Sequence, residues 1–370
     1  MSSMPSAVAV GQIFPNAEEH LVGVRQCMIE SSRDFVDRYN EGVFEQLNEF
    51  WKRPSKMFRS LVICRIVECL GGDLASAQAS GAVLEIYHAA SLIFDDIQDG
   101  SEVRRRGQCV HVTEGLSMAI SVGAVMRSLM YHPIHQCDAM DESQRLAAHH
   151  IVDQTCTRVA CGQAQEMHWR KRPDLEITAD AYVDMVGKKT GSLIRAAFNL
   201  GAMLSGCDEA LRRSLTDFGQ QFGILFQLHN DWMDLSGGHF IGRPAYDDVR
   251  DGKRTSMVLG CLEQLRIAGR HDDLKRYRTL LQTDRLDDTQ VQWCVDRLRE
   301  TGQIEAAGRD LHRRRDRLSS DAAAMGLPVN LHNTLQTMLC WLVPKSDHPG
   351  GSSSNRATAS SDHAAASASV

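Results

Sequence analysis

Two short acidic clusters contain the residues of this chain that are best suited to chemistry. The first is DDIQD at residues 95–99 and the second is NDWMD at residues 230–234, and each ends a long apolar run. The outer residues of each cluster are four apart, so they would share one face of a helix. Two acidic faces in one cavity repel each other unless cations lie between them. Hard oxygen ligands suit Mg²⁺, which completes its shell with water and phosphate oxygens. The clusters therefore predict a site for a diphosphate bridged by magnesium.

Basic side chains and a few neutral hydrogen-bonding groups occur near the acidic clusters. They are Lys56, Arg59, His88, Arg104, Arg105, Lys189, Thr190, Gln227, Arg243 and Lys253. Arginine and lysine bind phosphate oxygens directly, and the guanidinium group can do so through two parallel hydrogen bonds. Carboxylates and cations around one cavity would suit two diphosphates, one held through metal and one held directly by basic donors.

The pattern around these residues predicts helices. Between residues 17 and 343 apolar residues recur three and four apart, and alternating strand patterns are missing. Thr178, which Asp180 follows, is a candidate N-cap. We therefore predict an all-α fold, a single large helical bundle around a central cavity at residues 17–343. A flexible arm at residues 1–16 would precede it, and a disordered low-complexity tail at residues 344–370 would follow.

Composition narrows the class of protein. The chain has 370 residues, of which 43% are hydrophobic, and a net charge of −6. This charge argues against general nucleic-acid binding. The 11 cysteines form no CxxC pair, and no secretory signal, transit peptide or membrane-spanning run is recognisable. We expect a cytoplasmic protein with reduced thiols and no membrane span.

The basic and acidic motifs occur in an order that resembles a known family. RPSKMFRSL, LIFDDIQD, VRRRG, MVGKKTGSL and FQLHNDWMD follow one another within roughly residues 50–260. In this the chain is similar to the trans-isoprenyl diphosphate synthases, the polyprenyl synthetase family, and most of all to geranylgeranyl diphosphate synthases. The resemblance implies a trans-prenyltransferase that condenses isopentenyl diphosphate with dimethylallyl, geranyl or farnesyl diphosphate and releases diphosphate. It also implies three Mg²⁺ ions in each active site and a homodimer.

The resemblance implies a role for each candidate residue. Catalysis would depend on Asp95, Asp96, Asp99, Lys189, Asp231 and Asp234. Magnesium would bind to Asp95, Asp99, Asn230 and Asp234. The allylic diphosphate would be held by Arg104, Lys189 and Lys253, with Arg243 nearby, while Thr190 and Gln227 contact the reacting end. The diphosphate of isopentenyl diphosphate would be held by Lys56, Arg59, His88 and Arg105.

Small residues upstream of the first acidic cluster bear on product length. Ala90 and Ser91 lie five and four positions before Asp95. In the family a bulky residue here stops the product at C15, so their small size implies room for at least C20. Tyr87 is either the floor of a C20 pocket or a core aromatic that never touches the product. Geranylgeranyl diphosphate is the predicted product.

Several positions depart from the family pattern. Asn230 and Ala124 stand where aspartate is usual, and three arginines precede Gly107 where the family usually has two. The roles of Arg104 and Arg105 could therefore shift by one position. Asn230 leaves open a terpene cyclase on the same scaffold, although a cyclase has no need of the isopentenyl diphosphate site. A non-catalytic regulatory subunit is a further alternative, which the retained aspartates disfavour.

Overall fold

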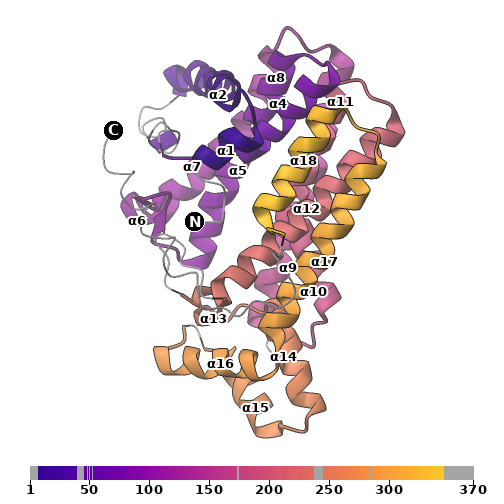
Figure 1. The fold of residues 1–370 in the computed structure, drawn as a ribbon. Helices are drawn as coiled ribbons and strands as arrows, with labels where there is room; N and C mark the ends of the chain where they lie inside the picture. Colours follow the sequence, from indigo (N-terminus) through magenta and orange to yellow (C-terminus); the bar gives the residue numbers. More distant parts are fainter. Residues whose placement is uncertain are drawn as a thin grey trace.

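Helices make up nearly all of the computed structural model (Figure 1). The structure describes residues 7–39, 46, 47, 49, 51, 53–172, 175–236, 245–283 and 285–345. The first half contains α1 (Ala7–Ile13), α2 (Ala17–Tyr39), α4 (Phe58–Leu70), α5 (Leu74–Asp99), α6 (Val110–Thr113), α7 (Gly115–Leu129), α8 (His132–Gln136) and α9 (Glu142–Lys171). The second half contains α10 (Ala179–Val186), the π-helix η1 (Gly187–Gly191), α11 (Ser192–Leu204), α12 (Glu209–Leu235), α13 (Asp247–Arg250), α14 (Ser256–Ile267), α15 (His271–Leu280), α16 (Asp288–Glu300), α17 (Gln303–Ala324) and α18 (Val329–Leu342). The predicted all-α fold is confirmed.

The long helices form one bundle around α11. This helix packs against both α12 and α4, α4 packs against α5, and α5 packs against α7. Phe198 of α11 and Phe218 and Phe222 of α12 are fully buried and lie ring against ring in the centre. Burying an aromatic side chain of this size is worth about 2–3 kcal/mol, so this contact anchors the two helices that carry the second half of the site. No helix in the described part of the chain has both the length and the apolarity to cross a bilayer.

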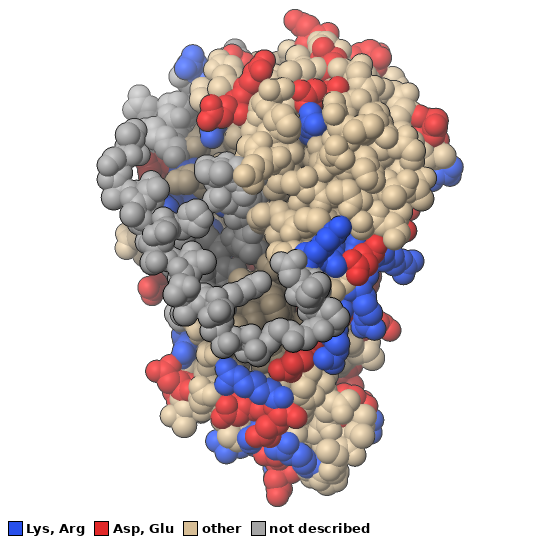
Figure 2. Space-filling model, viewed as in Figure 1, with Lys and Arg blue, Asp and Glu red and all other residues tan. Residues whose placement is uncertain are grey.

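A second, smaller core lies at the far end of the bundle, where α14, α15 and α16 gather below α17 in Figure 1. Leu265, Tyr277 and Leu298 are buried there. Acidic and basic side chains alternate over this end on the face shown in Figure 2, and no single basic patch covers that face. Arg270, for example, pairs with Asp273 and with Glu300. Such exposed pairs contribute little stability and keep the surface solvated.

The predicted flexible arm at residues 1–16 is wrong for its second half. Residues 7–13 form α1, which packs against α18. Phe14 is completely buried, and its ring lies edge-on to that of Phe58 with the two centroids 5.5 Å apart. The segment is apolar enough to bury Ile13 and Phe14, and that gain exceeds the entropy lost on ordering it. Residues 346–370 of the predicted tail lie outside the described residues.

Local signals in the sequence explain where helices begin. The hydroxyl of Thr178 accepts a hydrogen bond from the backbone N–H of Ala181, which confirms the predicted N-cap. Asp73 caps α5 in the same way through the N–H of Ser76. A two-stranded hairpin, β1 (Val103–Arg104) and β2 (Gly107–Gln108), was not predicted. Its strands are only two residues long, too short for an alternating pattern to appear in the sequence.

Candidate functional site

The first acidic cluster forms the last turns of α5. Asp95 and Asp99 line a cavity between α5, α9, α10 and α12, and they are separated by one helical turn. Asp96 points elsewhere and is only 3% exposed. It accepts a 2.7 Å hydrogen bond from Nε of Arg104 in the hairpin. The cluster therefore divides into two cavity carboxylates and one buried carboxylate that ties α5 to the hairpin.

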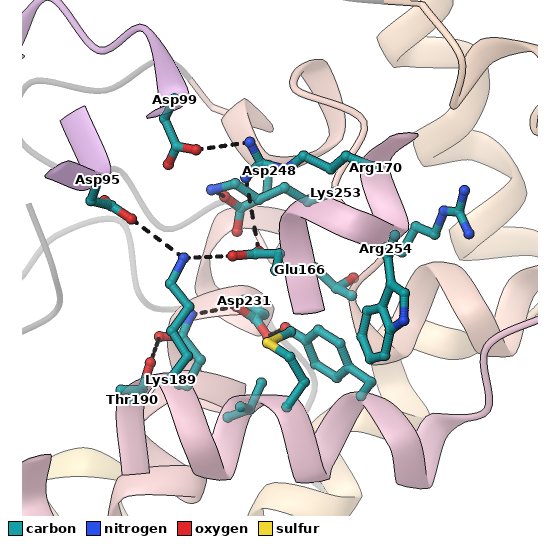
Figure 3. A pocket seen from close by; sticks show the side chains of 16 residues that line it. Asp95, Asp99, Glu166, Arg170, Lys189, Thr190, Asp231, Asp248, Lys253 and Arg254 are labelled. Carbon is teal, nitrogen blue, oxygen red and sulfur yellow. Dashed lines mark hydrogen bonds and ion pairs between the residues drawn. The ribbon is translucent and has the colours of Figure 1, made fainter. Parts of the chain in front are cut away.

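The cavity contains both signs of charge (Figure 3). Its carboxylates are Asp95, Asp99, Glu166, Asp231 and Asp248, and its basic side chains are Arg170, Lys189, Lys253 and Arg254. Of the residues assigned roles from the sequence, Thr190 and Gln227 also line it. This arrangement suits a strongly anionic ligand that arrives with its own cations.

Lys189 is placed by an unusual piece of helix. The π-helix η1 lies between α10 and α11, and π-helical turns of this kind are frequent at functional sites. A Cβ on Gly162 of α9 would lie 2.5 Å from the backbone nitrogen of Lys189, so only glycine permits this approach. Nζ of Lys189 then lies 2.5 Å from Oε2 of Glu166 and 3.4 Å from Oδ1 of Asp95. Burial opposes ionisation of Asp95, but the charges of Lys189 and Arg104 lower its pKa overall.

The second acidic cluster forms the last turns of α12. Asp231 lines the cavity, where its carboxylate accepts hydrogen bonds from the hydroxyl of Tyr182 at 2.5 Å and from Nε2 of Gln227 at 2.8 Å. Oε1 of Gln227 accepts in turn from the hydroxyl of Thr190 at 3.0 Å. Burial raises the pKa of Asp231 to about 7, and the nearby charge of Asp248 adds to the rise.

Asn230 and Asp234, the two residues of this cluster predicted to bind magnesium, do not line the cavity. Asp234 accepts hydrogen bonds from the backbone N–H groups of Asp247 and Asp248, each at 3.2 Å, at the start of α13. Burial and then the charge of Asp248 raise the pKa of Asp234 to about 6. Asn230 is half-buried on the same helix. The structure thus brings Asp231 and Asp248, rather than Asn230 and Asp234, to the wall that faces α5.

Apart from Lys189, the cations predicted for the allylic diphosphate differ in how they lie relative to the cavity. Lys253 lines the cavity and pairs with Asp248 at 2.6 Å. Arg104 lies beside Asp96 and within 3.4 Å of Asp95, and is not among the lining residues. Arg243 lies outside the described residues.

A second group of cations gathers where α4, α5 and the hairpin meet. Arg59 in the first turn of α4, His88 on α5 and Arg105 in the hairpin lie close enough for their charges to interact. Burial lowers the pKa of Arg59 and of Arg105, and burial also lowers the pKa of Lys56 just before α4. Burial, reinforced by these arginines, holds the pKa of His88 well below its ordinary value, so the imidazole is neutral. For Arg59 and Arg105 the nearby charge of Glu85 opposes the effect of burial, and a bound anion would oppose it further.

The hairpin separates the two arginines that the sequence left ambiguous. Arg105 and Arg106 occupy its turn with φ of 50° and 65°, which is unfavourable for residues other than glycine. Arg104 is consequently directed to the acidic cluster and Arg105 to the group around Arg59. Backbone strain of this kind persists where the surroundings require it, often at functional sites.

The residues predicted to limit product length lie at successive positions on α5. Ala90 is buried, and Ser91 is half-buried with its hydroxyl donating to the carbonyl of His88. The hydroxyl of Tyr87 donates to the carbonyl of Cys156 on α9 at 3.3 Å, and the guanidinium of Arg127 on α7 lies 5.7 Å from the ring centroid. Tyr87 therefore joins three helices two turns before Asp95.

The donor set fits magnesium shared with a ligand. Among the described residues, no three His, Cys, Asp or Glu side chains gather closely enough to hold a metal ion alone. The carboxylates instead stand on two walls, with Asp95 and Asp99 on α5 and Asp231 and Asp248 opposite. Mg²⁺ commonly takes one or two carboxylates and completes its octahedron with water and phosphate oxygens. Burial and the charge of Asp248 raise the pKa of Asp231 to about 7, and a bound cation would favour its ionised form.

Sequence reasoning missed several residues of the cavity. No role was assigned to Glu166, Arg170, Tyr182 or Arg254, although each of them lines it. Glu166 and Arg170 are four apart at the end of α9. Such acid–base pairs are common on solvated helix faces, so the spacing alone was a weak signal.

Comparisons with known proteins agree with a site that binds diphosphates. Residues 41–298 match the family described as polyprenyl synthetase. A short chain isoprenyl diphosphate synthase of Methanothermobacter thermautotrophicus is 37% identical over 199 residues, which is 53% of this chain and 60% of that protein's length. A geranylgeranyl diphosphate synthase of Sulfolobus acidocaldarius is 28% identical over 64% of this chain and 73% of its own. The solved geranylgeranyl pyrophosphate synthetase of Pyrococcus horikoshii has a similar fold, with a TM-score of 0.80 at 23% identity, covering 90% of this chain and 99% of its own.

Proposed function

The chain belongs to the polyprenyl synthetase family of trans-prenyltransferases, and on this premise we propose that it condenses isopentenyl diphosphate with an allylic diphosphate and releases diphosphate. The observation that carries the proposal is a pair of candidate anion sites that both include residues of α5. The cavity around Asp95 and Asp99 combines several carboxylates with cations, whereas the group around Arg59, His88 and Arg105 is mainly basic, with the buried Glu85 near its two arginines. One site suits a diphosphate with metal and the other suits a diphosphate without it.

Magnesium would supply charge to stabilise the leaving diphosphate as the allylic C–O bond ionises. Asp95 and Asp99 would hold it from α5, and Asp231 with Asp248 would hold it from the opposite wall. This assignment replaces the predicted ligands Asn230 and Asp234 with residues that line the cavity. The number of three ions stays a prediction from the resemblance.

Cationic residues of the cavity would bind the allylic diphosphate directly. Lys189 and Lys253 carry their charges into the cavity, where exclusion of water strengthens their effect on charge that develops as the bond breaks. Thr190, Gln227 and Asp231 form one hydrogen-bonded chain beside Lys189. This chain would fix the polar side of the reacting end, because each member has its partner already in place.

The group around Arg59 would bind and orient isopentenyl diphosphate. Arg59, Arg105 and Lys56 would contribute charge, and the neutral His88 would contribute a hydrogen bond. Binding of both substrates beside α5 would bring the double bond of one to the forming cation of the other. The proton then lost would pass to the released diphosphate, and no protein nucleophile is required.

We infer geranylgeranyl diphosphate as the product from the small Ala90 and Ser91 and the position of Tyr87. Tyr87 is held by the carbonyl of Cys156 and by Arg127, so it is a rigid candidate floor. Ala90→Phe should shorten the product by at least one C5 unit, and Ala89→Phe, on an adjacent buried position, serves as the matched control. An unchanged product from Ala90→Phe in a folded protein would place the tail elsewhere.

One incubation tests the reaction itself. The purified protein would receive Mg²⁺, isopentenyl diphosphate and each of the C5, C10 and C15 allylic diphosphates, with mass analysis of dephosphorylated products and of hydrocarbons. A C20 alcohol is the expected result. A cyclic hydrocarbon formed without isopentenyl diphosphate would instead establish the cyclase alternative, and no product from any primer would contradict both. A homodimer and a cytoplasmic location stay predictions.

A further inference from the structure

Glu166, at the end of α9, lies between two cations that each reach an aspartate of α5 (Figure 3). Lys189 connects Glu166 to Asp95, and Arg170 connects Glu166 to Asp99. All five groups line the same cavity. In this arrangement the charges that would bind metal and diphosphate neutralise one another.

The two cations divide their contacts unequally. Nζ of Lys189 is 2.5 Å from Glu166 and 3.4 Å from Asp95, so it belongs mainly to Glu166. Nη1 of Arg170 is 2.8 Å from Asp99, whereas its Nη2 is 3.9 Å from Glu166, so it belongs mainly to Asp99. Asp95 thus has only a long contact with Lys189, whereas Asp99 accepts a short charge-assisted hydrogen bond from Arg170.

Arg170 also has an unused donor. Its Nε–H is buried and has no acceptor among the described residues. A guanidinium presents its donors in a fixed planar fork, which matches phosphate oxygens better than a single carboxylate oxygen does. Arg170 therefore donates a hydrogen bond to Asp99, while its own Nε–H is left without an acceptor among the described residues.

We propose that Arg170 occupies the magnesium position at Asp99 in the ligand-free protein, and that its guanidinium moves from Asp99 to the diphosphate when the metal–diphosphate complex binds. Glu166, one helical turn before Arg170, would remain as the carboxylate that keeps the guanidinium in the cavity during the exchange. Metal without diphosphate would have to displace Arg170 and leave it with fewer partners. Metal with diphosphate would replace the lost partner, so the two ligands would bind cooperatively.

The proposal rests on the proposed function for the identity of the ligand as a metal–diphosphate complex. It can be tested without turnover, with Mn²⁺ and inorganic diphosphate as probes. Binding of Mn²⁺ alone would be followed by electron paramagnetic resonance of the free ion. Binding of diphosphate at saturating Mn²⁺ would be followed by calorimetry.

Arg170→Gln should change the two affinities in opposite directions. Mn²⁺ alone should bind about 10-fold more tightly, because a competing positive charge has been removed from Asp99. Diphosphate in the presence of Mn²⁺ should bind about 10-fold more weakly, because its guanidinium partner is lost. Arg170→Lys, which keeps the charge, should give smaller changes of both kinds and covers the case in which the glutamine variant fails to fold.

Two further variants make the test specific. Arg254→Gln removes a charge from the same cavity, but this guanidinium donates to the carbonyl oxygens of Arg172 and Leu175. It should leave the affinity for Mn²⁺ within about 3-fold of wild type. In an Asp99→Asn background, Arg170→Gln should give no gain in Mn²⁺ affinity, because the two residues act on one position.

Opposite changes in Arg170→Gln that vanish in the Asp99→Asn background would support the exchange. Any other combination overturns it, including an equal gain in Arg254→Gln, which would indicate only a general effect of charge. Condensation by the wild-type protein would be assayed separately. If the wild type makes no prenyl product but the binding pattern holds, the proposed function fails and the exchange stands. If it makes product and the pattern is missing, the exchange alone fails.

Discussion

The two acidic clusters share a four-residue spacing and a position at a helix end, yet the structure gives them opposite electrostatic surroundings. The carboxylates of α5 face Arg104, Lys189 and Arg170, and the pKa of Asp95 falls below its ordinary value despite burial. The carboxylates of α12 face a hydroxyl, an amide and backbone N–H groups. Their pKa values rise to about 7 for Asp231 and about 6 for Asp234, mainly through burial.

This difference shows that the same motif can serve two purposes. On α5, the charges of Lys189 and Arg104 lower the pKa of Asp95, so protein cations already favour its ionised form. The α12 wall can carry a proton near neutral pH, so metal binding there would have to displace it. We therefore expect metal to bind first to the carboxylates of α5. Those of α12 would bind metal afterwards, with loss of this proton.

The largest effect is expected at Asp95. Asp95→Ala should lower turnover by about 10³-fold, because it removes a cavity carboxylate that would hold magnesium. Its melting temperature should change little, since Asp95 is only loosely paired with Lys189. Asp96→Ala should instead lower stability by about 3 kcal/mol, because it leaves Arg104 without its buried partner. Steady-state kinetics and thermal denaturation of both variants provide the measurement, and full activity in folded Asp95→Ala would contradict the metal role.

The opposite wall can be tested with a second pair of variants. Asp248→Asn should lower turnover by about 100-fold, since Asp248 lines the cavity. Asp234→Asn should lower it by about 10-fold or less, because that carboxylate binds the backbone at the start of α13. A magnesium titration of both variants would separate metal binding from turnover. A larger loss in Asp234→Asn would restore the ligand assignment made from the sequence.

The raised pKa of Asp231 predicts a pH dependence of stability. An unfolded aspartate titrates near pH 3.9, so between about pH 4 and 7 the folded protein binds a proton that the unfolded chain does not. The stabilising contribution is complete below pH 4 and is lost as pH rises through about 7. Between pH 6 and pH 8 the ligand-free protein should lose about 1–2 kcal/mol from this group. Denaturant unfolding of wild type and Asp231→Asn at both pH values should show this difference only in wild type, and equal slopes would contradict the raised pKa.

The smallest effect is expected from restoring a carboxylate at Asn230. Asn230→Asp should lower the magnesium concentration for half-maximal activity by about 5-fold, because it adds a negative charge next to Asp231 in the sequence, near the second wall. Asn333→Asp adds the same charge at an exposed position of α18 and should have no effect. A higher magnesium requirement in Asn230→Asp would show that the added charge instead disturbs Asp231.

Much of the fold was accessible from the sequence, because helical periodicity, N-caps and glycine stops are local signals. Asp73 and Thr178 cap their helices as their residue types indicate. The burial of Phe14 could not be predicted from the sequence. It depends on packing against Phe58 and on the contact between α1 and α18, which are distant in the chain. The hairpin escaped notice because its strands are two residues long.

The sequence by itself determined which residues could bind metal and diphosphate, since side-chain chemistry and helical spacing are properties of the chain. It identified Asp95, Asp99, Lys189 and Asp231, which do line one cavity. Only the tertiary structure decided which carboxylates face that cavity, which are ionised, and which cations hold them. Asp234 accepts a hydrogen bond from the backbone at the start of α13, and Glu166 and Arg170 of α9 line the cavity. The direction of a side chain, its burial and the charges beside it depend on helices that are distant in the sequence. No local sequence pattern therefore contains this information.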